Sequence, residues 1–385
     1  MTLLLNNDID QSLEAAAEHI RHGGLVAFPT ETVYGLGADA RHAQAVRRIY
    51  EVKRRPATDP LIVHVPSVEF AEEMIDPRRT STWQRSALRI LADAFWPGPL
   101  TLILPAHPEN ISFDVTSGTG LVGLRRPAHP LAQKFLEHCR IPVAAPSANL
   151  FGHVSPTTAE HVLADFPHVD NLWILDGGRC GFGIESSVVR LNEDETVDVL
   201  RRGGVGPARL MQILRDTGLS DRPETSVRVL ERFVEDSSST TPHAAPGQLL
   251  VHYAPRIPAS MVSIEERAVV GQANTLVSED KLKKTIVLDF GSQLNGLSRR
   301  VGFYRNLSSV GDSREAAYSL FDALRWAENC APESGQLWIF NPKDINHHGD
   351  ELFLALQDRV IRAASGCSTK LVVTPDFGPI YASIR

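Results

Sequence analysis

The sequence predicts an α/β protein built from two domains. Its 385 residues exceed what one ordinary hydrophobic core accommodates. Short apolar runs alternate with stretches of helical periodicity, and one hairpin is visible, which together favour a twisted, open, mixed sheet. Near residues 220–246 the composition shifts to Ser, Thr and Pro, which is typical of a linker. We therefore expect a first domain at 1–215, a linker at 216–258, and a smaller Rossmann-like α/β domain at 259–385.

The first domain is expected to alternate helices and strands. Helices are predicted where apolar residues recur at helical spacing, at 9–21, 43–52, 68–74, 82–95, 130–139, 157–165 and 208–214. Strands are predicted where apolar residues run together, at 25–28, 61–65, 100–104, 121–124, 143–145 and 172–175, with a hairpin of 186–191 and 196–201. Most of these strands end at Pro, Gly, Ser, Thr or Arg, so we expect ligands to bind at strand ends.

The second domain shows fewer clear elements. Strands are predicted at 285–290 and 335–340, and helices at 313–328 and 351–364. The first of these strands reads IVLDFG and lacks the GxGxxG pattern, so a dinucleotide site is not expected. The tail from Ser365 to Arg385 has no predicted role.

The amino-acid composition argues against several classes of protein. The chain has no apolar run near the roughly 20 residues that a membrane span requires, and its N-terminus lacks the pattern of a secretory signal. Four widely spaced cysteines favour a reducing compartment and argue against a zinc site, so we expect a cytoplasmic protein without membrane contact. The net charge of -7 argues against a broad nucleic-acid surface.

The stretch GGLVAFPTETVYGLGADA, residues 23–40, carries the first concentration of chemistry. Its strand stops at Pro29, and hydroxyls and a carboxylate follow at Thr30, Glu31 and Thr32. A cationic cluster follows at Lys53, Arg54 and Arg55, and His64 lies within the next predicted strand, 61–65. Hydroxyls and fixed cations near strand ends predict a site for an anionic ligand.

The polar and charged residues near the predicted strand ends also have simpler interpretations than ligand binding. Lys53 and Arg55 could end a solvated helix, His64 could be a core histidine, Ser147 and Asn149 could cap a turn, and Arg201 could lie on a surface turn. Glu31 and Glu185 could act as general bases, or could equally orient a cation or a backbone amide. A covalent nucleophile is not expected, because neither a GxSxG elbow nor a Walker pattern is present.

Taken together, the motifs resemble those of the long, two-domain threonylcarbamoyl-AMP synthase family. They are PTETVYGLG (29–37), KRRP with PLIVH (53–64), WPGPLT (96–101), LRRP (124–127), APSAN (145–149), SPT (155–157), ESSVV (185–189), LRRGG (200–204) and HYAP (252–255). The resemblance implies a twisted open α/β sheet around a large electropositive cleft. It also implies synthesis of threonylcarbamoyl-adenylate and pyrophosphate from L-threonine, bicarbonate and ATP.

The resemblance also implies which residues bind. The threonine side would be lined by Thr32, His64, Arg125, Ala145 and Ser186, with Arg125 clamping a carboxylate. The ATP side would be lined by Lys53, Arg55, Asp59, Ser147, Asn149, Ser155, Arg201 and Tyr253, with Tyr253 of the linker acting as a lid. Mg²⁺ would arrive with ATP, held largely by phosphate oxygens and water.

The implied product is used by downstream transfer proteins that modify the adenosine beside the anticodon of ANN-decoding tRNAs, and a weak contact with tRNA itself is part of this expectation. Asp59 departs from the family pattern, which commonly has Asn there, and places a negative charge near the phosphates. Two other classes stay open: an RNA-binding module, and a carbamoyl-transfer domain of the hydrogenase-maturation kind, whose acylphosphatase and zinc-finger segments are not visible here.

Overall fold

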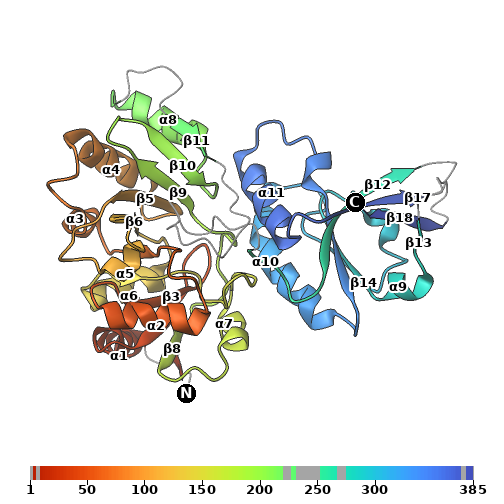
Figure 1. The fold of residues 1–385 in the computed structure, drawn as a ribbon, viewed down its shortest axis with the longest axis horizontal. Helices are drawn as coiled ribbons and strands as arrows, with labels where there is room; N and C mark the ends of the chain where they lie inside the picture. The colour runs from red at the N-terminus through yellow and green to blue at the C-terminus, as the bar shows by residue number, and fades with distance from the viewer. Residues whose placement is uncertain are drawn as a thin grey trace. The chain divides into compact units, whose positions relative to one another are not determined.

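The chain folds into two units, as the sequence predicts. The computed structural model describes residues 3–5, 9–219, 227–230, 252–266, 275–373 and 379–384. The first unit comprises Met1–Phe151 and Ser155–Leu249, and the second comprises Gly152–Val154 and Leu250–Arg385 (Figure 1). The short segment Gly152–Val154 therefore belongs to the second unit, although its neighbours on both sides in sequence belong to the first.

A mixed sheet forms the centre of the first unit. In the described residues it has eleven strands in the order β1-β8-β2-β3-β7-β4-β6-β5-β9-β10-β11. Both parallel and antiparallel pairs occur, as between β4 and β6 and between β5 and β6. The bounds are Leu3–Leu5 (β1), Leu25–Phe28 (β2), Gly35–Asp39 (β3), Ile62–His64 (β4), Leu100–Pro105 (β5), Leu121–Arg125 (β6), Val143–Ala144 (β7), Leu172–Leu175 (β8), Ser187–Leu191 (β9), Val197–Arg201 (β10) and Val227–Val229 (β11).

Helices bury both sides of strand β2. On one side, Val26 and Phe28 join a core cluster with apolar residues of α1 and α6. On the other side, Leu25 and Ala27 join a larger cluster that includes residues of α2 and α4. The strand is thus apolar throughout, because both of its faces are covered. The helices of this unit are Ile9–Arg21 (α1), Ala43–Lys53 (α2), Val68–Glu73 (α3), Thr82–Phe95 (α4), Phe113–Thr116 (α5), Pro130–Cys139 (α6), Ala159–Asp165 (α7) and Pro207–Asp216 (α8).

Strand β3 was not predicted, because its sequence, GLGAD, contains two glycines and no apolar run. The structure instead pairs β3 with β2 in an antiparallel hairpin. A Cβ atom at position 37 would lie 2.9 Å from a methyl carbon of Val143 and 3.1 Å from the ring of Phe28. The glycine is therefore needed for close packing on the protein's own side chains.

The first unit also extends past residue 215. Strand β11 lies in the range assigned to the linker, and it pairs in parallel with β10. Three residues rich in valine suffice to join an existing sheet edge, although they carry little periodicity of their own. Most of the predicted linker, residues 220–226 and 231–251, lies outside the described residues.

The second unit contains a smaller α/β sheet. Its seven described strands follow the order β13-β18-β17-β12-β16-β14-β15. The five from β17 to β15 are parallel to one another, and β18 is antiparallel to both β17 and β13. The tail without a predicted role supplies β17 and β18. The bounds are Ala259–Glu266 (β12), Thr275–Leu276 (β13), Thr285–Asp289 (β14), Phe303–Asn306 (β15), Gln336–Phe340 (β16), Ser368–Val373 (β17), Ile380–Ile384 (β18), Glu279–Lys283 (α9), Ser313–Cys330 (α10) and Glu351–Ala363 (α11).

None of the helices in the described ranges is both long and apolar enough to cross a membrane.

Candidate active site

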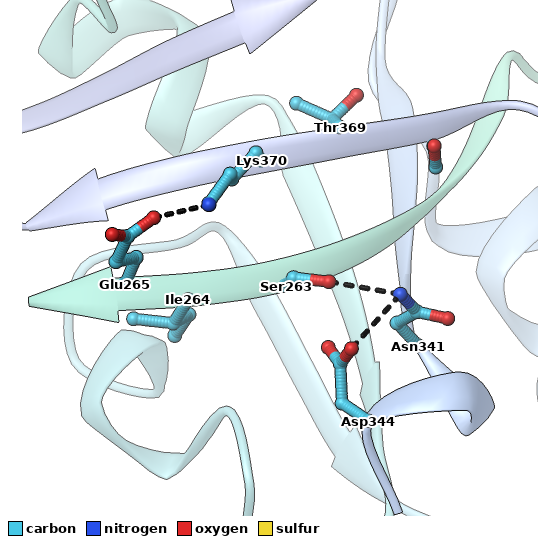
Figure 2. A pocket seen from close by; sticks show the side chains of 8 residues that line it. Ser263, Ile264, Glu265, Asn341, Asp344, Thr369 and Lys370 are labelled. Carbon is cyan, nitrogen blue, oxygen red and sulfur yellow. Dashed lines mark hydrogen bonds and ion pairs between the residues drawn. The ribbon is translucent and has the colours of Figure 1, made fainter. Parts of the chain in front are cut away.

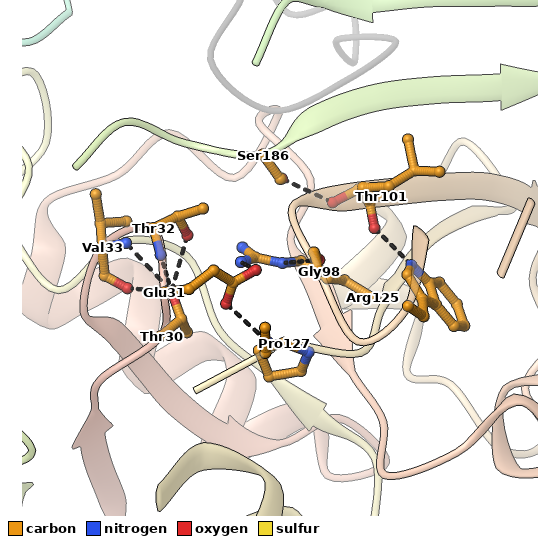
Figure 3. Close-up of polar contacts among 12 residues, drawn as sticks. Thr30, Glu31, Thr32, Val33, Gly98, Thr101, Arg125, Pro127 and Ser186 are labelled. Atoms are coloured by element: carbon orange, nitrogen blue, oxygen red, sulfur yellow. Dashed lines mark hydrogen bonds and ion pairs between the residues drawn. The ribbon is translucent and has the colours of Figure 1, made fainter. Parts of the chain in front are cut away.

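The turn after β2 is built by the side chain of Thr30. Its hydroxyl accepts the backbone N–H groups of Thr32 and Val33, each at 3.1 Å, and donates to the carbonyl of Val33 at 2.6 Å. A side-chain oxygen that bonds backbone two and three residues ahead closes a tight turn. Glu31, at the second position of this turn, points toward Arg125 (Figure 3).

Glu31 and Arg125 form a salt bridge of 2.7 Å. The second carboxylate oxygen of Glu31 accepts the N–H of Ala128 at 2.9 Å, and Arg125 Nε donates to the carbonyl of Gly98 at 3.3 Å. Only 5% of the Arg125 side chain is exposed, compared with 17% for Glu31. Arg125 therefore binds the carboxylate of Glu31 in this geometry, and its contact with a threonine carboxylate stays a prediction.

His64 is the last residue of β4 and lies opposite Arg125 of β6 in the sheet register. Its ring meets the edge of Phe28 at 5.6 Å between centroids. Burial, together with the charge of Arg125, lowers the pKa of His64 to about 3, partly opposed by a hydrogen bond to the backbone of Val143. The imidazole is thus neutral at physiological pH and adds no charge beside Arg125.

Ser186 joins residues expected on the two sides of the site. Its hydroxyl lies 2.9 Å from that of Thr101 (Figure 3). The same hydroxyl accepts from Arg201 Nη2 at 3.1 Å. Arg201 Nε also donates to the carbonyl of Ser186 at 3.0 Å. The structure thus brings a predicted threonine-side residue and a predicted ATP-side residue into direct contact. Thr101, in β5, was not predicted as a site residue, because a single hydroxyl in an apolar strand stands out only once its partner is known.

A second buried contact joins Ser155, a predicted ATP-side residue, to Glu185. The Ser155 hydroxyl donates to Glu185 Oε1 at 2.6 Å. Both residues are at most 5% exposed. Glu185 was predicted to act as a general base or to orient a cation or a backbone amide, and here its carboxylate accepts from a hydroxyl that is expected to contact the nucleotide.

Lys53 is 1% exposed and holds the backbone of the APSAN segment. Its ammonium donates to the carbonyl of Ser147 at 2.6 Å and to that of Asn149. Burial, together with the nearby Arg55 charge, lowers the pKa of Lys53 well below its ordinary value. The structure therefore gives Lys53 the task of positioning Ser147 and Asn149, whose side chains also bond each other. Direct contact between Lys53 and a nucleotide stays a prediction.

Asp59, the residue that departs from the family pattern, is paired with Arg55. The two charged groups lie 2.9 Å apart, with only 4% of Arg55 and 1% of Asp59 exposed. Arg55 also donates to the backbone carbonyls of Asp59 and Pro60. The negative charge is compensated within the protein, so it does not stand alone in the site.

The two remaining predicted residues are Ala145 and Tyr253, and the ligand contacts of all the predicted residues stay predictions. Ala145 is 4% exposed, and a Cβ at Gly35 would lie 3.2 Å from its methyl group, so it closes the sheet surface beneath the turn. Tyr253 belongs to the second unit, where its fully buried ring packs 5.2 Å from Phe321 and 5.7 Å from the guanidinium of Arg359. The lid role of Tyr253 stays a prediction.

A separate pocket of about 430 Å³ lies in the second unit (Figure 2). Lys370 pairs with Glu265 on one side, and Asn341 donates to Ser263 and Asp344 on the other. Each of these polar groups already has a partner, and none belongs to the sequence motifs of the first unit.

The fold defines a two-unit α/β protein, in which arginines, hydroxyls and carboxylates of the first unit's sequence motifs contact one another. Family models match the chain twice: the model described as "Telomere recombination" matches residues 18–203, and "Threonylcarbamoyl-AMP synthase, C-terminal domain" matches 216–365. A threonylcarbamoyl-AMP synthase of Pyrococcus abyssi is 38% identical over 95% of this chain and 98% of its own length. That of Bacillus subtilis is 40% identical over 66% of this chain and 67% of its own.

The structure of P. abyssi Sua5 complexed with L-threonine superposes with a TM-score of 0.73 at 32% identity, covering 97% of this chain and 98% of that one. The chain belongs to the threonylcarbamoyl-AMP synthase family. It is an enzyme of the nucleotidyltransferase type, and the family predicted from its motifs is confirmed.

Proposed function

We propose that this chain is an L-threonylcarbamoyladenylate synthase that condenses L-threonine, bicarbonate and ATP. The observation that carries the proposal is the near full-length match to a relative of that name. The products would be threonylcarbamoyl-AMP and pyrophosphate. Downstream transfer proteins would use the adenylate to form N6-threonylcarbamoyladenosine in tRNA, with at most weak tRNA contact by this chain. We expect the enzyme in the cytoplasm, as its few, widely spaced cysteines predict.

Arg125 would hold the threonine carboxylate. Its guanidinium already binds the Glu31 carboxylate at 2.7 Å, so an incoming carboxylate finds a donor fork oriented for it. Glu31 is the more exposed partner of the pair, so its carboxylate could move aside or share Arg125 with the substrate. The neutral ring of His64 would leave Arg125 as the positive charge at this position, without a second cation beside it.

The reaction needs two bonds to form in turn. The threonine amine attacks carbon dioxide derived from bicarbonate to form a carbamate, losing a proton. A carbamate oxygen then attacks the α-phosphorus of ATP, and pyrophosphate leaves. Charge builds on the phosphate oxygens in this second step, so fixed cations and hydroxyl donors lower its barrier. Arg201 would supply positive charge to the expected electropositive cleft, and Ser147 and Ser155 would supply hydroxyls. Arg55 would contact the nucleotide with its charge largely balanced by Asp59.

Mg²⁺ would enter with ATP. In the part of the chain that the structure describes, His, Cys, Asp and Glu residues form no group of three or more that could hold a metal ion. Among the site carboxylates, Asp59 is paired with Arg55, and Glu185 accepts from Ser155. This donor set suits an ion held by phosphate oxygens and water, whose chemistry is to neutralise phosphate charge.

The decisive experiment follows pyrophosphate release by the purified chain with ATP, Mg²⁺ and bicarbonate, with and without L-threonine, and identifies the adenylate by mass. We expect release that depends on threonine, together with the mass of threonylcarbamoyl-AMP. Serine and alanine provide matched control substrates. Absence of release, combined with salt-sensitive RNA binding, would contradict the proposal and support an RNA-binding module.

A further inference from the structure

The segment Gly152–Val154 connects two motifs of the active site, yet it is built into the second unit. Asn149 precedes it in APSAN, and Ser155 follows it in SPT. Both flanks are anchored in the first unit: the N–H of Phe151 donates to the carbonyl of Lys53 at 2.8 Å, and Ser155 donates to Glu185. Any displacement of the segment is therefore transmitted along the chain to residues expected to bind the nucleotide.

Every residue of this segment is held by a contact inside the second unit. The carbonyl of Gly152 accepts the N–H of Ala254 at 2.9 Å. The carbonyl of Val154 accepts from Arg325, a buried residue of α10. His153 Nε2 lies 2.9 and 3.0 Å from the two carboxylate oxygens of Glu328, three residues further along α10.

Glu328 holds a second segment as well. Its Oε1 accepts the backbone N–H of Arg256, directly after the HYAP motif. Only 13% of its side chain is exposed, compared with 7% for His153. Burial alone would raise the pKa of Glu328, but the hydrogen bonds from His153 and Arg256 outweigh it and keep the pKa below its ordinary value. The carboxylate is thus charged, and it ties HYAP and Gly152–Val154 to the same point of α10.

The contact between Glu328 and His153 contributes more to the geometry of the segment Gly152–Val154 than to the stability of the fold. Burying a carboxylate and an imidazole costs hydration, and packed apolar side chains in their place are often as stabilising. An ionic contact, however, fixes the direction of a backbone segment, because both partners must meet at hydrogen-bond distance.

We propose that Glu328 is a positioning residue for the nucleotide side of the active site, acting through His153 on the segment between Asn149 and Ser155. The inference rests on the proposed function, since it assigns that side to ATP. It predicts that ATP binding depends on a side chain of the C-terminal domain, whereas threonine binding, centred on Arg125, does not.

The test uses the full chain with Glu328→Gln, His153→Gln and the double variant. Glu315→Gln, an exposed carboxylate of the same helix, is the matched control. Calorimetric titration with ATP and Mg²⁺ is expected to show affinity reduced about ten-fold in each single variant, because misplaced binding groups lose their alignment. Threonine affinity should change less than about two-fold, and the double variant should be no weaker than the weaker single, since both act through one contact.

Unchanged ATP affinity in both single variants would overturn the inference, as would equal losses for ATP and threonine, or additive effects in the double variant. A lower unfolding temperature with unchanged ATP affinity would show a merely structural contact. Threonine-dependent turnover by the wild-type chain tests the proposed function separately. If the wild-type chain turns over threonine and the variants bind ATP normally, this inference alone is wrong. If the wild-type chain binds ATP but shows no turnover, the proposed reaction alone is wrong.

Discussion

Two arginine–carboxylate pairs are buried in the first unit, and they differ in how completely they are enclosed. Arg55 and Asp59 are four residues apart, are both almost fully buried, and are joined further by backbone carbonyls. Arg125 and Glu31 come from distant parts of the chain, and Glu31 keeps more exposure. The enclosed pair is suited to maintaining local structure, whereas the proposed function requires the more open pair to exchange its carboxylate for that of threonine.

The largest effect is expected from Arg125→Ala. Loss of the guanidinium removes the donor fork for the threonine carboxylate, so threonine-dependent pyrophosphate release should fall about 100- to 1,000-fold. Steady-state kinetics with varied threonine measures this. Arg47→Ala, which breaks the exposed pair with Asp114, is the control and should stay within about two-fold. Near wild-type release by Arg125→Ala would remove the distinction between the two buried pairs.

Asp59→Asn should affect stability more than chemistry. The variant leaves the Arg55 charge without its buried partner, and the free energy of unfolding should fall by about 3 kcal/mol. If Arg55 faces the nucleotide, ATP with Mg²⁺ should restore part of this loss. Urea unfolding with and without ATP measures both quantities, with Asp114→Asn as the exposed control. A loss below about 1 kcal/mol would show that this pair is not structurally important.

The pH dependence of stability tests the surroundings of Arg125 through its neighbour His64. Its folded pKa of about 3 lies below the ordinary value of 6.5, so below pH 6.5 the unfolded chain binds a proton that the folded chain does not. This contribution to the free energy of unfolding is absent above pH 6.5 and is destabilising below it, reaching about 2 kcal/mol at pH 5. His64→Gln should lack it.

Urea unfolding of wild type and His64→Gln between pH 5 and pH 8 isolates this contribution as a difference between the two proteins. A difference that does not vary with pH would mean that the imidazole takes up its proton in the folded state near its ordinary pKa, and that Arg125 has a charged neighbour.

The smallest effect is expected from Glu31→Gln. The amide oxygen can still accept the N–H of Ala128, and the pair is less completely buried than Arg55–Asp59. The free energy of unfolding should therefore fall by less than about 1 kcal/mol. Urea unfolding of this variant beside Asp59→Asn provides the direct comparison. Equal losses in the two variants would mean that Arg125–Glu31 is as structural as the enclosed pair.

Local sequence predicted most of the elements of the first unit well. Helix 130–139 and strand 172–175 agree with the structure at both ends, because apolar spacing and a flanking Pro or Gly act within a few residues. Strand β3 was missed, since its glycines are required by Val143 and Phe28, which are remote in sequence. Strand β12 of the second unit was missed too, because its preference depends on being flanked by β16 and β17.

The sequence by itself determined which residue types stand at the site, since motifs such as LRRP and APSAN place Arg125 and Ser147 without knowledge of their partners. Only the tertiary structure decided those partners and the resulting charge states. Glu31 meets Arg125 across 94 residues of chain, and burial is what makes His64 neutral. Pairing and burial arise from long-range packing, whereas residue type and turn chemistry are properties of neighbouring positions.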